Sequence, residues 1–462
     1  MAQPSTASLR PDDRDRRAVR ARELIAALGR EQVDAVALTL VDNAGITRVK
    51  TVPLAGLEQA AAWGVGMSPV FDAFLVDDSI APGGRPDGDL RGLPDLDRLT
   101  RLAAQPGWAW APVDRYTQDG EPYPVCQRLF ARRMADRAGE AGFSVRMGFE
   151  VEWVVGDEQD GQFVPACHGP GYGMTRLVEL SDYCRAVHVA LAAESLPVLQ
   201  VHPEYAGGQF EVSVGPTDPV AAADVAVLVR ETVRAVSARH GLRASFAPVV
   251  VAGSVGNGGH VHVSVHRDGA NLFAGGDRPY GMTAAGESFL AGLLAQLPAM
   301  VAVGAPSVPS YLRLVPSRWA GAYQCWGREN REAALRFVTG SVGEADRSAN
   351  AEVKCFDLSA NPYLVAGAVL AAGLSTVDKD LRLPDEVSGD PAAAADELAG
   401  RGVARLPQSV PEALGHLEQS GALRGAMGEP LYESFVDVRR AEVALFAGAT
   451  PEAVVAATRW RY

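Results

Sequence analysis

Two spacings of apolar residues alternate along this chain, one typical of helices and one typical of strands. Apolar residues recur every three to four positions over residues 18–28, which predicts an amphipathic helix ended by Gly29. They then alternate over 33–41 and again over 46–52, on either side of the turn sequence DNAG. This pattern predicts a β-hairpin near the start of the fold.

A small α+β domain is predicted around this hairpin. A further strand is expected at 108–113, after a loop rich in Gly, Pro and Asp, and the unit ends near a Gly/Pro turn at 120–124. The first residues are polar and carry no apolar periodicity. We therefore expect a disordered tail over 1–17 and a first domain over 18–122.

The rest of the chain predicts a larger α+β domain over 123–462. Helical spacing and strand alternation follow one another before the chain becomes rich in Ala and Leu after residue 362, with a Pro/Asp/Gly break near 384–391. The predicted helices are 128–141, 181–194 and 219–241, and the predicted strands are 145–155, 198–201, 245–251 and 259–266. No internal repeat is apparent.

Carboxylates gather on the polar faces of these strands. Side chains alternate between the two faces of a strand, so Glu150 and Glu152 share one face while Phe149, Val151 and Trp153 share the other. A single pair of this kind is usually a solvated sheet face. The same half-charged alternation recurs downstream and contributes further candidate ligands, so that the pooled set is Glu150, Glu152, Glu204, Glu211, His260 and Glu352.

This ligand set favours hard divalent cations. Five carboxylates and one imidazole without a thiolate suit Mg²⁺ or Mn²⁺ better than zinc or copper. The charge exceeds what one ion needs and fits two or three ions that also bind phosphate oxygens. Three arginines, Arg313, Arg331 and Arg336, supply permanent cations nearby. Each could be a surface residue, but together beside metals they would indicate phosphoryl transfer.

Composition narrows the class of protein. The formal net charge of -13 over 462 residues argues against nucleic acid or an anionic membrane as the main partner. The five cysteines are scattered and form no C-x-x-C, which favours reduced thiols. We expect neither a signal peptide nor an apolar run of membrane-spanning length, and we expect a cytoplasmic location.

Taken in order, these motifs resemble the glutamine synthetase family from about residue 20 onward. The stretches that carry the resemblance are VDNAGITRVK (41–50), GFEVE (148–152), HPEYAGGQFE (202–211), GGHVHVS (258–264), YLRLVP (311–316), WGRENR (326–331), AEVK (351–354) and SANPY (359–363). The resemblance implies a β-grasp N-terminal domain and a catalytic domain with a curved antiparallel sheet, or half-barrel, backed by helices. It also implies a homo-oligomer, a double-ring dodecamer.

The resemblance further implies roles for single residues. Glu152, Glu204 and Glu211 would hold one metal, and Glu150, His260 and Glu352 the other. His262 and Ser264 match ATP contacts, the three arginines match phosphate- and glutamate-binding positions, and Gly256 matches a loop near glutamate. The Gly-rich sequence around Gly256 could otherwise be a simple hairpin turn. The family phosphorylates the glutamate side-chain carboxylate with ATP, and an amine then attacks.

Several positions depart from the family pattern. Trp319 stands where the family has a glutamate that takes a proton from ammonium, and a tryptophan cannot do so. Asp72 stands at the aspartate of the family's aspartate-glycine-serine-serine motif, which is broken in the residues that follow it, but Asp72 is expected to keep its catalytic role at the ammonium site. Lys354 replaces a substrate-binding arginine.

These departures predict an ATP- and Mg²⁺-dependent ligase that joins glutamate to a primary amine. Loss of a carboxylate to Trp319 favours a small monoamine such as ethanolamine over a polyamine such as putrescine or spermidine, although Asp77 and Asp78 could receive a distal ammonium. Glutamine synthesis from ammonium, a non-catalytic scaffold and a phosphagen-type phosphotransferase are the further alternatives.

Overall fold

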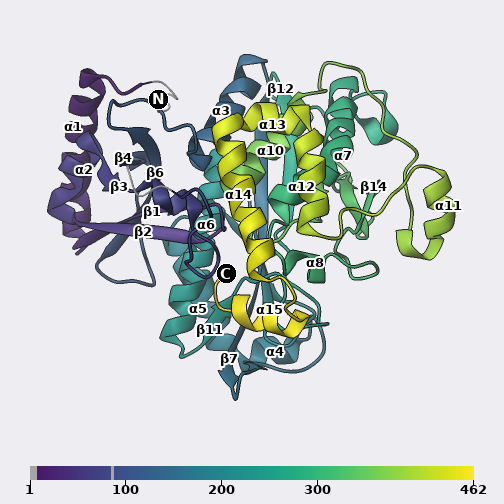
Figure 1. Cartoon of the computed structure of the whole chain (residues 1–462), viewed down its shortest axis with the longest axis horizontal. Coiled ribbons are helices and arrows are strands. Elements are labelled where there is room, and N and C mark those ends of the chain that lie inside the picture. Colours follow the sequence, from purple (N-terminus) through teal and green to yellow (C-terminus); the bar gives the residue numbers. More distant parts are fainter. Residues whose placement is uncertain (1–7, 85–87) are drawn as a thin grey trace.

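Two β-sheets organise the chain, and the computed structural model describes residues 8–84 and 88–462. The smaller sheet lies in the N-terminal part, drawn in purple and dark blue in Figure 1, and the larger lies beneath the helices of the rest of the chain. Together they form the α+β architecture expected, a β-grasp sheet beside a curved half-barrel sheet backed by helices.

The smaller sheet has the strand order β2-β1-β6-β4-β3, with β5 paired to β6. Its strands are β1 (Ala35–Val41), β2 (Thr47–Pro53), β3 (Val65–Met67), β4 (Leu90–Pro94), β5 (Thr100–Arg101) and β6 (Trp108–Thr117). The predicted hairpin is confirmed, since β1 and β2 pair antiparallel. Its turn needs glycine at Gly45, which has φ +80 and whose Cβ would lie 1.9 Å from the Ser359 carbonyl oxygen.

The expected N-terminal tail is wrong from residue 11 onward. Helix α1 (Pro11–Arg30) begins there, with Pro11 in its first turn and the Asp13 carboxylate accepting a hydrogen bond of 3.1 Å from the Arg10 backbone N–H. It packs with α2 (Leu57–Trp63) over the sheet. Capping residues therefore extend the helix beyond its apolar stretch, while residues 1–7 lie outside the described part of the chain.

The larger sheet has the order β14-β15-β16-β12-β7-β10-β9 and carries three short strands beside this path. Its strands are β7 (Ser144–Gln159), β8 (Gln162–Pro165), β9 (Val198–Pro203), β10 (Gln209–Val214), β11 (Arg243–Ser245), β12 (Val261–Arg267), β13 (Ala270–Asn271), β14 (Tyr323–Arg328), β15 (Ala333–Val338) and β16 (Asn350–Val353). The predicted strand at 245–251 is wrong beyond Ser245. Pro248 has no backbone N–H to donate to a neighbouring strand. Residues 246–250 are instead buried against the C-terminal residues, where the Phe246 N–H donates to the Tyr462 carbonyl.

Helices cover the apolar face of this sheet. Phe149, Val151 and Trp153 on β7 are at most 4% exposed, and α6 packs against that strand while α10 packs against α3, α6 and α7. The helices of this part are α3 (Gln127–Glu140), α4 (Met174–Glu179), α5 (Ser181–Ala193), α6 (Pro219–Arg239), α7 (Ala284–Gly304), α8 (Ser310–Arg313), α9 (Ala345–Ser348), α10 (Pro362–Leu374), α11 (Ala395–Gly400), α12 (Val410–Gln419), α13 (Gly421–Met427), α14 (Glu429–Leu445) and α15 (Pro451–Thr458). The glutamate face is thereby left open on the other side.

Helix α7 is the described element that bears on the expectation about membrane-spanning runs. It is long and apolar enough to cross a membrane by length and composition, although Glu287 and Gln296 interrupt its apolar sequence. However, 83% of its apolar window is buried within the fold, as in the core helix of a globular protein. Composition alone could not separate these two environments.

Buried charges join the two parts of the chain. The Arg128 guanidinium on α3 lies 2.6 Å from Asp95, 2.8 Å from Asp114 and 2.8 Å from Asp224. Breaking such a pair leaves an uncompensated buried charge, so the arrangement fixes how the small sheet sits on the helices. The strands of the smaller sheet all end before the expected domain boundary at 122/123, and those of the larger sheet all begin after it. The boundary itself stays a proposal.

Candidate active site

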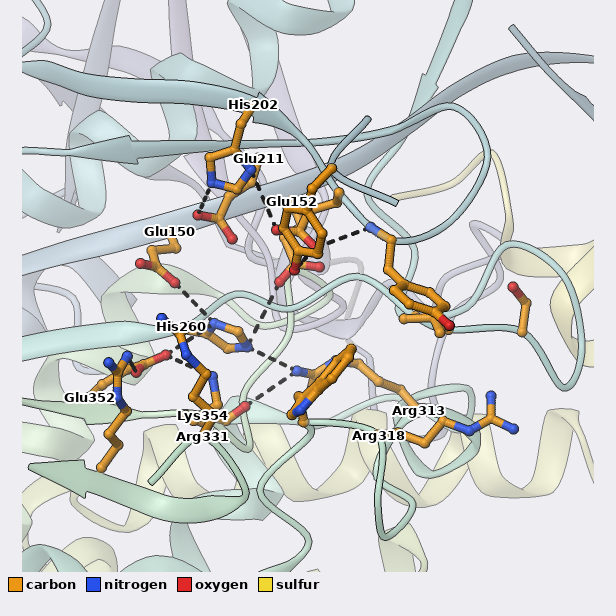
Figure 2. A pocket seen from close by; sticks show the side chains of 18 of the residues that line it. Glu150, Glu152, His202, Glu211, His260, Arg313, Arg318, Arg331, Glu352 and Lys354 are labelled. Atoms are coloured by element: carbon orange, nitrogen blue, oxygen red, sulfur yellow. Dashed lines mark hydrogen bonds and ion pairs between the residues drawn. The ribbon is translucent and has the colours of Figure 1, made fainter. Parts of the chain in front are cut away.

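A pocket of about 610 Å³ opens on the polar face of the large sheet. Figure 2 shows acidic, imidazole and guanidinium groups converging on it from separate strands and loops. All six residues predicted as metal ligands line it: Glu150, Glu152, Glu204, Glu211, His260 and Glu352.

Strand register explains this convergence. In the β7–β10 ladder Glu152 faces Glu211, and in the β12–β16 ladder His262 faces Glu352. Side chains of directly opposed residues lie on the same face of a sheet, a few ångströms apart. Polar side chains that alternate along each strand are therefore brought together into one cluster when the strands pair.

Two groups of potential ligands form within the cluster. In the first, ligand atoms of Glu150, His262 and Glu352 all lie within 4.8 Å of one another, and His260 Nδ1 is 3.0 Å from Glu150 Oε2 and 3.3 Å from Glu352 Oε1. In the second, the same 4.8 Å limit holds for His202, Glu204 and Glu211.

The second group contains a residue that the sequence reading missed. His202 Nε2 lies 3.3 Å from Glu211 Oε1, and His202 faces Glu211 in the β9–β10 ladder. His202 belongs to the HPEYAGGQFE stretch, so its type was visible. The missing information was the register between β9 and β10.

Burial and the neighbouring charged groups shift the pKa values of the glutamates in this cluster. Burial, followed by the nearby Glu211 and Glu204 carboxylates, raises the pKa of Glu152 to about 8. Burial also opposes ionisation of Glu150, but hydrogen bonds from His260 and His262 outweigh it and hold the pKa of Glu150 well below its usual range. A buried acidic cluster that holds protons in the absence of cations is suited to binding divalent metal ions, which displace them.

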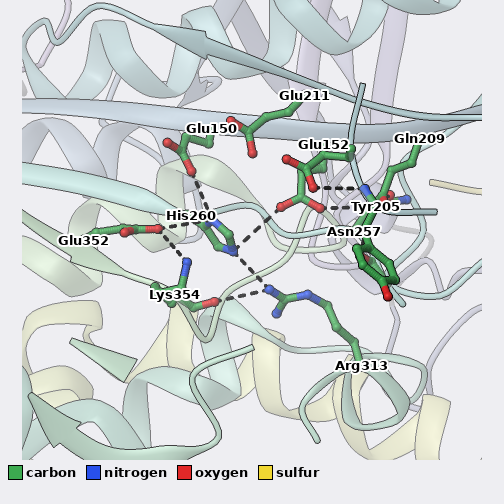
Figure 3. A network of polar contacts seen from close by, with 12 residues as sticks. Glu150, Glu152, Tyr205, Gln209, Glu211, Asn257, His260, Arg313, Glu352 and Lys354 are labelled. Atoms are coloured by element: carbon green, nitrogen blue, oxygen red, sulfur yellow. Dashed lines mark hydrogen bonds and ion pairs between the residues drawn. The ribbon is translucent and has the colours of Figure 1, made fainter. Parts of the chain in front are cut away.

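Cationic side chains form the opposite wall, as Figure 3 shows. Arg313 Nη2 lies 3.2 Å from His260 Nε2 and donates to the Lys354 carbonyl at 3.3 Å. Lys354 Nζ and Arg336 Nη1 contact the two oxygens of Glu352 at 2.9 and 3.0 Å. Arg331 also lines the pocket. These groups can hold phosphate or carboxylate oxygens beside the acidic cluster.

The loop at Gly256 passes close to this wall. Gly256 lines the pocket, and a Cβ there would lie 2.1 Å from the Pro248 carbonyl oxygen and 2.8 Å from Arg313 Cγ. Only glycine lets the backbone approach Arg313 this closely.

A second cavity of about 820 Å³ adjoins the first, and Glu150 and Gln200 line both. His262 and Ser264, the residues expected to contact ATP, line the second cavity rather than the first. The His262 ring is held by Asn350, with 2.7 Å between Nδ1 and Oδ1. The shared Glu150 edge can bring phosphates in the second cavity up to the acidic cluster.

Three half-exposed aromatic residues rim the first pocket. Trp319 is 48% exposed, Tyr205 51% and Tyr172 58%. The Tyr172 hydroxyl donates to Glu204 at 2.8 Å. Sequence reasoning found Trp319 but missed both tyrosines, which lie on loops without periodicity. Exposed aromatic faces beside a carboxylate suit an organic cation.

Asp72 is not brought to the pocket. It is 4% exposed, and both of its oxygens lie 2.8 Å from the Arg115 guanidinium inside the N-terminal part. Gln127 Nε2 makes a further contact of 3.3 Å. Both carboxylate oxygens are thus engaged inside the chain, which favours a structural role, while the catalytic role expected of Asp72 stays a prediction.

A curved sheet that gathers paired glutamates, histidines and arginines beside two adjoining cavities is the arrangement expected of a metal-dependent enzyme that acts on phosphate-bearing substrates. Residues 124–456 match the family described as glutamine synthetase, catalytic domain. The chain belongs to the glutamine synthetase family, whose members are ATP-dependent ligases that use a divalent metal, and it is a glutamate–amine ligase.

Similar proteins include two ligases that act on organic amines, along with several glutamine synthetases. A γ-glutamylpolyamine synthetase, GlnA3, of Streptomyces coelicolor is 56% identical over 462 residues, covering 98% of this chain and 98% of its own. A glutamate–methylamine ligase of Methyloversatilis universalis is 28% identical over 90% of this chain and 93% of its own. A crystal structure described as a novel glutamine synthase homolog superposes with a TM-score of 0.83 at 33% identity, covering 93% of this chain and 99% of the other.

Proposed function

We propose that this chain is a γ-glutamylpolyamine synthetase, which activates the glutamate side-chain carboxylate with ATP and joins it to a terminal amine of a polyamine. The observation that carries the proposal is the 56% identity to a γ-glutamylpolyamine synthetase over nearly the full length of both chains. This similarity reverses the preference for ethanolamine that the sequence analysis gave, because two chains this similar over their full length are expected to use the same class of amine.

The aromatic rim supports a long, cationic acceptor. A polyamine alternates alkyl segments with ammonium groups, and aromatic faces can cover the former and attract the latter. The argument for a monoamine rested on losing one carboxylate to Trp319. A second carboxylate is nevertheless present at this rim, since the Trp319 N–H donates to Glu332 Oε1 at 2.8 Å.

Two or three Mg²⁺ or Mn²⁺ ions fit the acidic cluster. In this proposal Glu150, His260 and Glu352 hold one ion and Glu152, Glu204 and Glu211 another, with His262 and His202 close enough to join them. Bound metal would neutralise phosphate charge. Arg313, Arg331, Arg336 and Lys354 would bind phosphate and glutamate oxygens, and the second cavity would take the nucleoside of ATP next to His262 and Ser264.

Assembly and location follow from the family and are proposals too. We expect a homo-oligomer, a double-ring dodecamer, in the cytoplasm. Light scattering on the purified chain in the presence of Mg²⁺ measures the number of subunits, and a monomer would contradict this expectation.

Amine-dependent phosphate release tests the proposed activity. The purified protein is supplied with ATP, Mg²⁺, glutamate and one of spermine, spermidine, putrescine, ethanolamine or ammonium, and the γ-glutamyl product is identified by mass spectrometry. A polyamine should give the highest kcat/KM. A higher value for ethanolamine or ammonium would overturn the polyamine assignment, and no product with any of these amines would favour the scaffold alternative.

A further inference from the structure

A small cavity lined by arginines lies outside both active-site cavities. It has a volume of about 160 Å³ and is formed by the hairpin turn between β1 and β2, one face of α6 and the last residues of the chain. Its lining residues are Gly45, Ile46, Thr47, Arg230, Glu231, Arg234, Arg461 and Tyr462. In the described part of the chain, none of these residues lines the catalytic pocket or the adjoining cavity.

Arg230 is the anomalous residue of this cavity. It is 4% exposed, and its Nη1 donates to the Leu358 carbonyl at 2.8 Å. Among residues 8–84 and 88–462, its Nε and Nη2 have no hydrogen-bond partner and no carboxylate lies within 4.0 Å of its guanidinium. Burial, with the charge of Arg234, lowers the pKa of Arg230 to about 10. A buried cation without a counter-charge is costly, and a bound anion would offset that cost.

Two further guanidiniums complete the lining. Arg234 lies over the Phe246 ring at 4.8 Å and pairs weakly with Glu231 at 3.4 Å. Arg461 is 43% exposed and contacts Asp78 at 2.7 Å. The cavity holds roughly five times the volume of one liquid water, which is room for a single phosphate-sized group and too little for a nucleotide.

We propose that the Arg230 cavity binds a free tetrahedral oxyanion of the phosphate class, at a site separate from the catalytic pocket. Charge-assisted N–H donors on arginine match the oxygens of such an anion. The anion would satisfy the two unpartnered nitrogens of Arg230 and supply the counter-charge that its guanidinium lacks.

The position of this site connects it to the catalytic loops. Arg230 holds the carbonyl of Leu358, in the segment that follows β16, and the neighbouring Phe356 carbonyl accepts a hydrogen bond of 3.0 Å from the Gly259 N–H. Gly259 precedes His260 directly. An oxyanion in the cavity would therefore bind the side chain that holds the segment supporting the His260 loop.

Crystals of the full chain soaked in selenate, an anomalous-scattering analogue of phosphate, locate the site directly. We expect an anomalous peak within hydrogen-bond distance of Arg230, in addition to any peak in the catalytic pocket. Selenate in the catalytic pocket alone would overturn the proposal. So would an acidic side chain of a second copy occupying the Arg230 cavity.

Calorimetric titration with inorganic phosphate measures the affinity while Mg²⁺ and a non-hydrolysable ATP analogue occupy the catalytic pocket. Arg230→Met and Arg461→Gln should each weaken phosphate binding about tenfold or more, because each removes charge-assisted hydrogen bonds. The exposed Arg185→Gln is the control and should not change it. Arg461 lies at the surface, so its variant keeps the test valid if Arg230→Met folds poorly. Equal affinity in Arg461→Gln and the control would contradict the site.

Discussion

The indole of Trp319 lies edge-on to the phenol of Tyr205, with ring centroids 5.7 Å apart and planes inclined at 71°. Trp319 comes from the loop after α8 and Tyr205 from the turn between β9 and β10. Arg318 reaches a third loop, where its Nη1 donates to the Gly253 carbonyl at 3.1 Å. Three loops thus meet at the mouth of the pocket, next to the Glu204 carboxylate.

Replacing Trp319 with leucine should weaken polyamine binding. The variant removes one face of the aromatic rim, and a cation–π contact at a partly exposed site contributes about 0.5–2 kcal/mol, or roughly 2- to 30-fold in affinity. We expect the KM for spermidine to rise within this range while the KM for ATP stays unchanged. Steady-state kinetics of phosphate release measure both values.

The matched control for this variant is Trp63→Leu, because Trp63 is 52% exposed but lies on α2, away from the pocket. It should leave both KM values as they are. If Trp319→Leu left the KM for spermidine unchanged, or raised the KM for ATP equally, Trp319 would not be part of the amine site.

Glu332 should act as a positioning residue for Trp319. Trp319 has a left-handed backbone with φ 54, which is strained for a bulky residue, and its N–H donates to Glu332 Oε1 at 2.8 Å. Glu332→Ala removes this acceptor, so we expect the KM for polyamine to rise several-fold with little change in kcat. Glu332→Gln keeps a side-chain oxygen that can accept, and should retain most of the affinity.

Glu433→Gln, at an exposed position on α14, is the control for general effects of losing a carboxylate. Equal losses in Glu332→Ala and Glu332→Gln would indicate that the charge of Glu332, rather than its contact with Trp319, matters for the amine.

The sequence could predict residues whose positions follow from local periodicity. Alternation along β7 gave the shared face of Glu150 and Glu152, because a strand fixes side-chain direction without reference to the rest of the fold. It could not give the pairing of His202 with Glu211, which depends on register, or the placement of Tyr172 and Tyr205, which lie on irregular loops. The pairing of Asp72 with Arg115 joins residues distant in sequence and was equally out of reach.

The Asp72–Arg115 pair should contribute to stability rather than to catalysis. Asp72→Asn leaves the Arg115 guanidinium, which is 1% exposed, without its counter-charge, and losing one partner of a buried pair costs about 3–5 kcal/mol. We expect the free energy of unfolding in urea to fall by about this amount. Activity per folded molecule should stay near that of the unmodified protein.

Asp119→Asn, at an exposed position, should change neither quantity. A loss of kcat by orders of magnitude in Asp72→Asn, with the unfolding free energy unchanged, would return Asp72 to the catalytic role that its motif suggested.

Stability of the metal-free protein should fall as pH rises, through Glu152. The pKa of Glu152 is raised to about 8 in the fold, above its value in an unfolded chain, so between these values the folded protein binds the extra proton. Its contribution to stability is fully present below the unfolded pKa and is lost as pH rises through about 8.

Mg²⁺ competes with the proton on Glu152, so the increase in Tm on adding Mg²⁺ should be larger at about pH 8.5 than at about pH 6. Differential scanning calorimetry measures this difference, and Glu152→Gln should flatten the pH dependence of the metal-free protein. An equal gain from Mg²⁺ at both pH values would mean that Glu152 does not hold this proton.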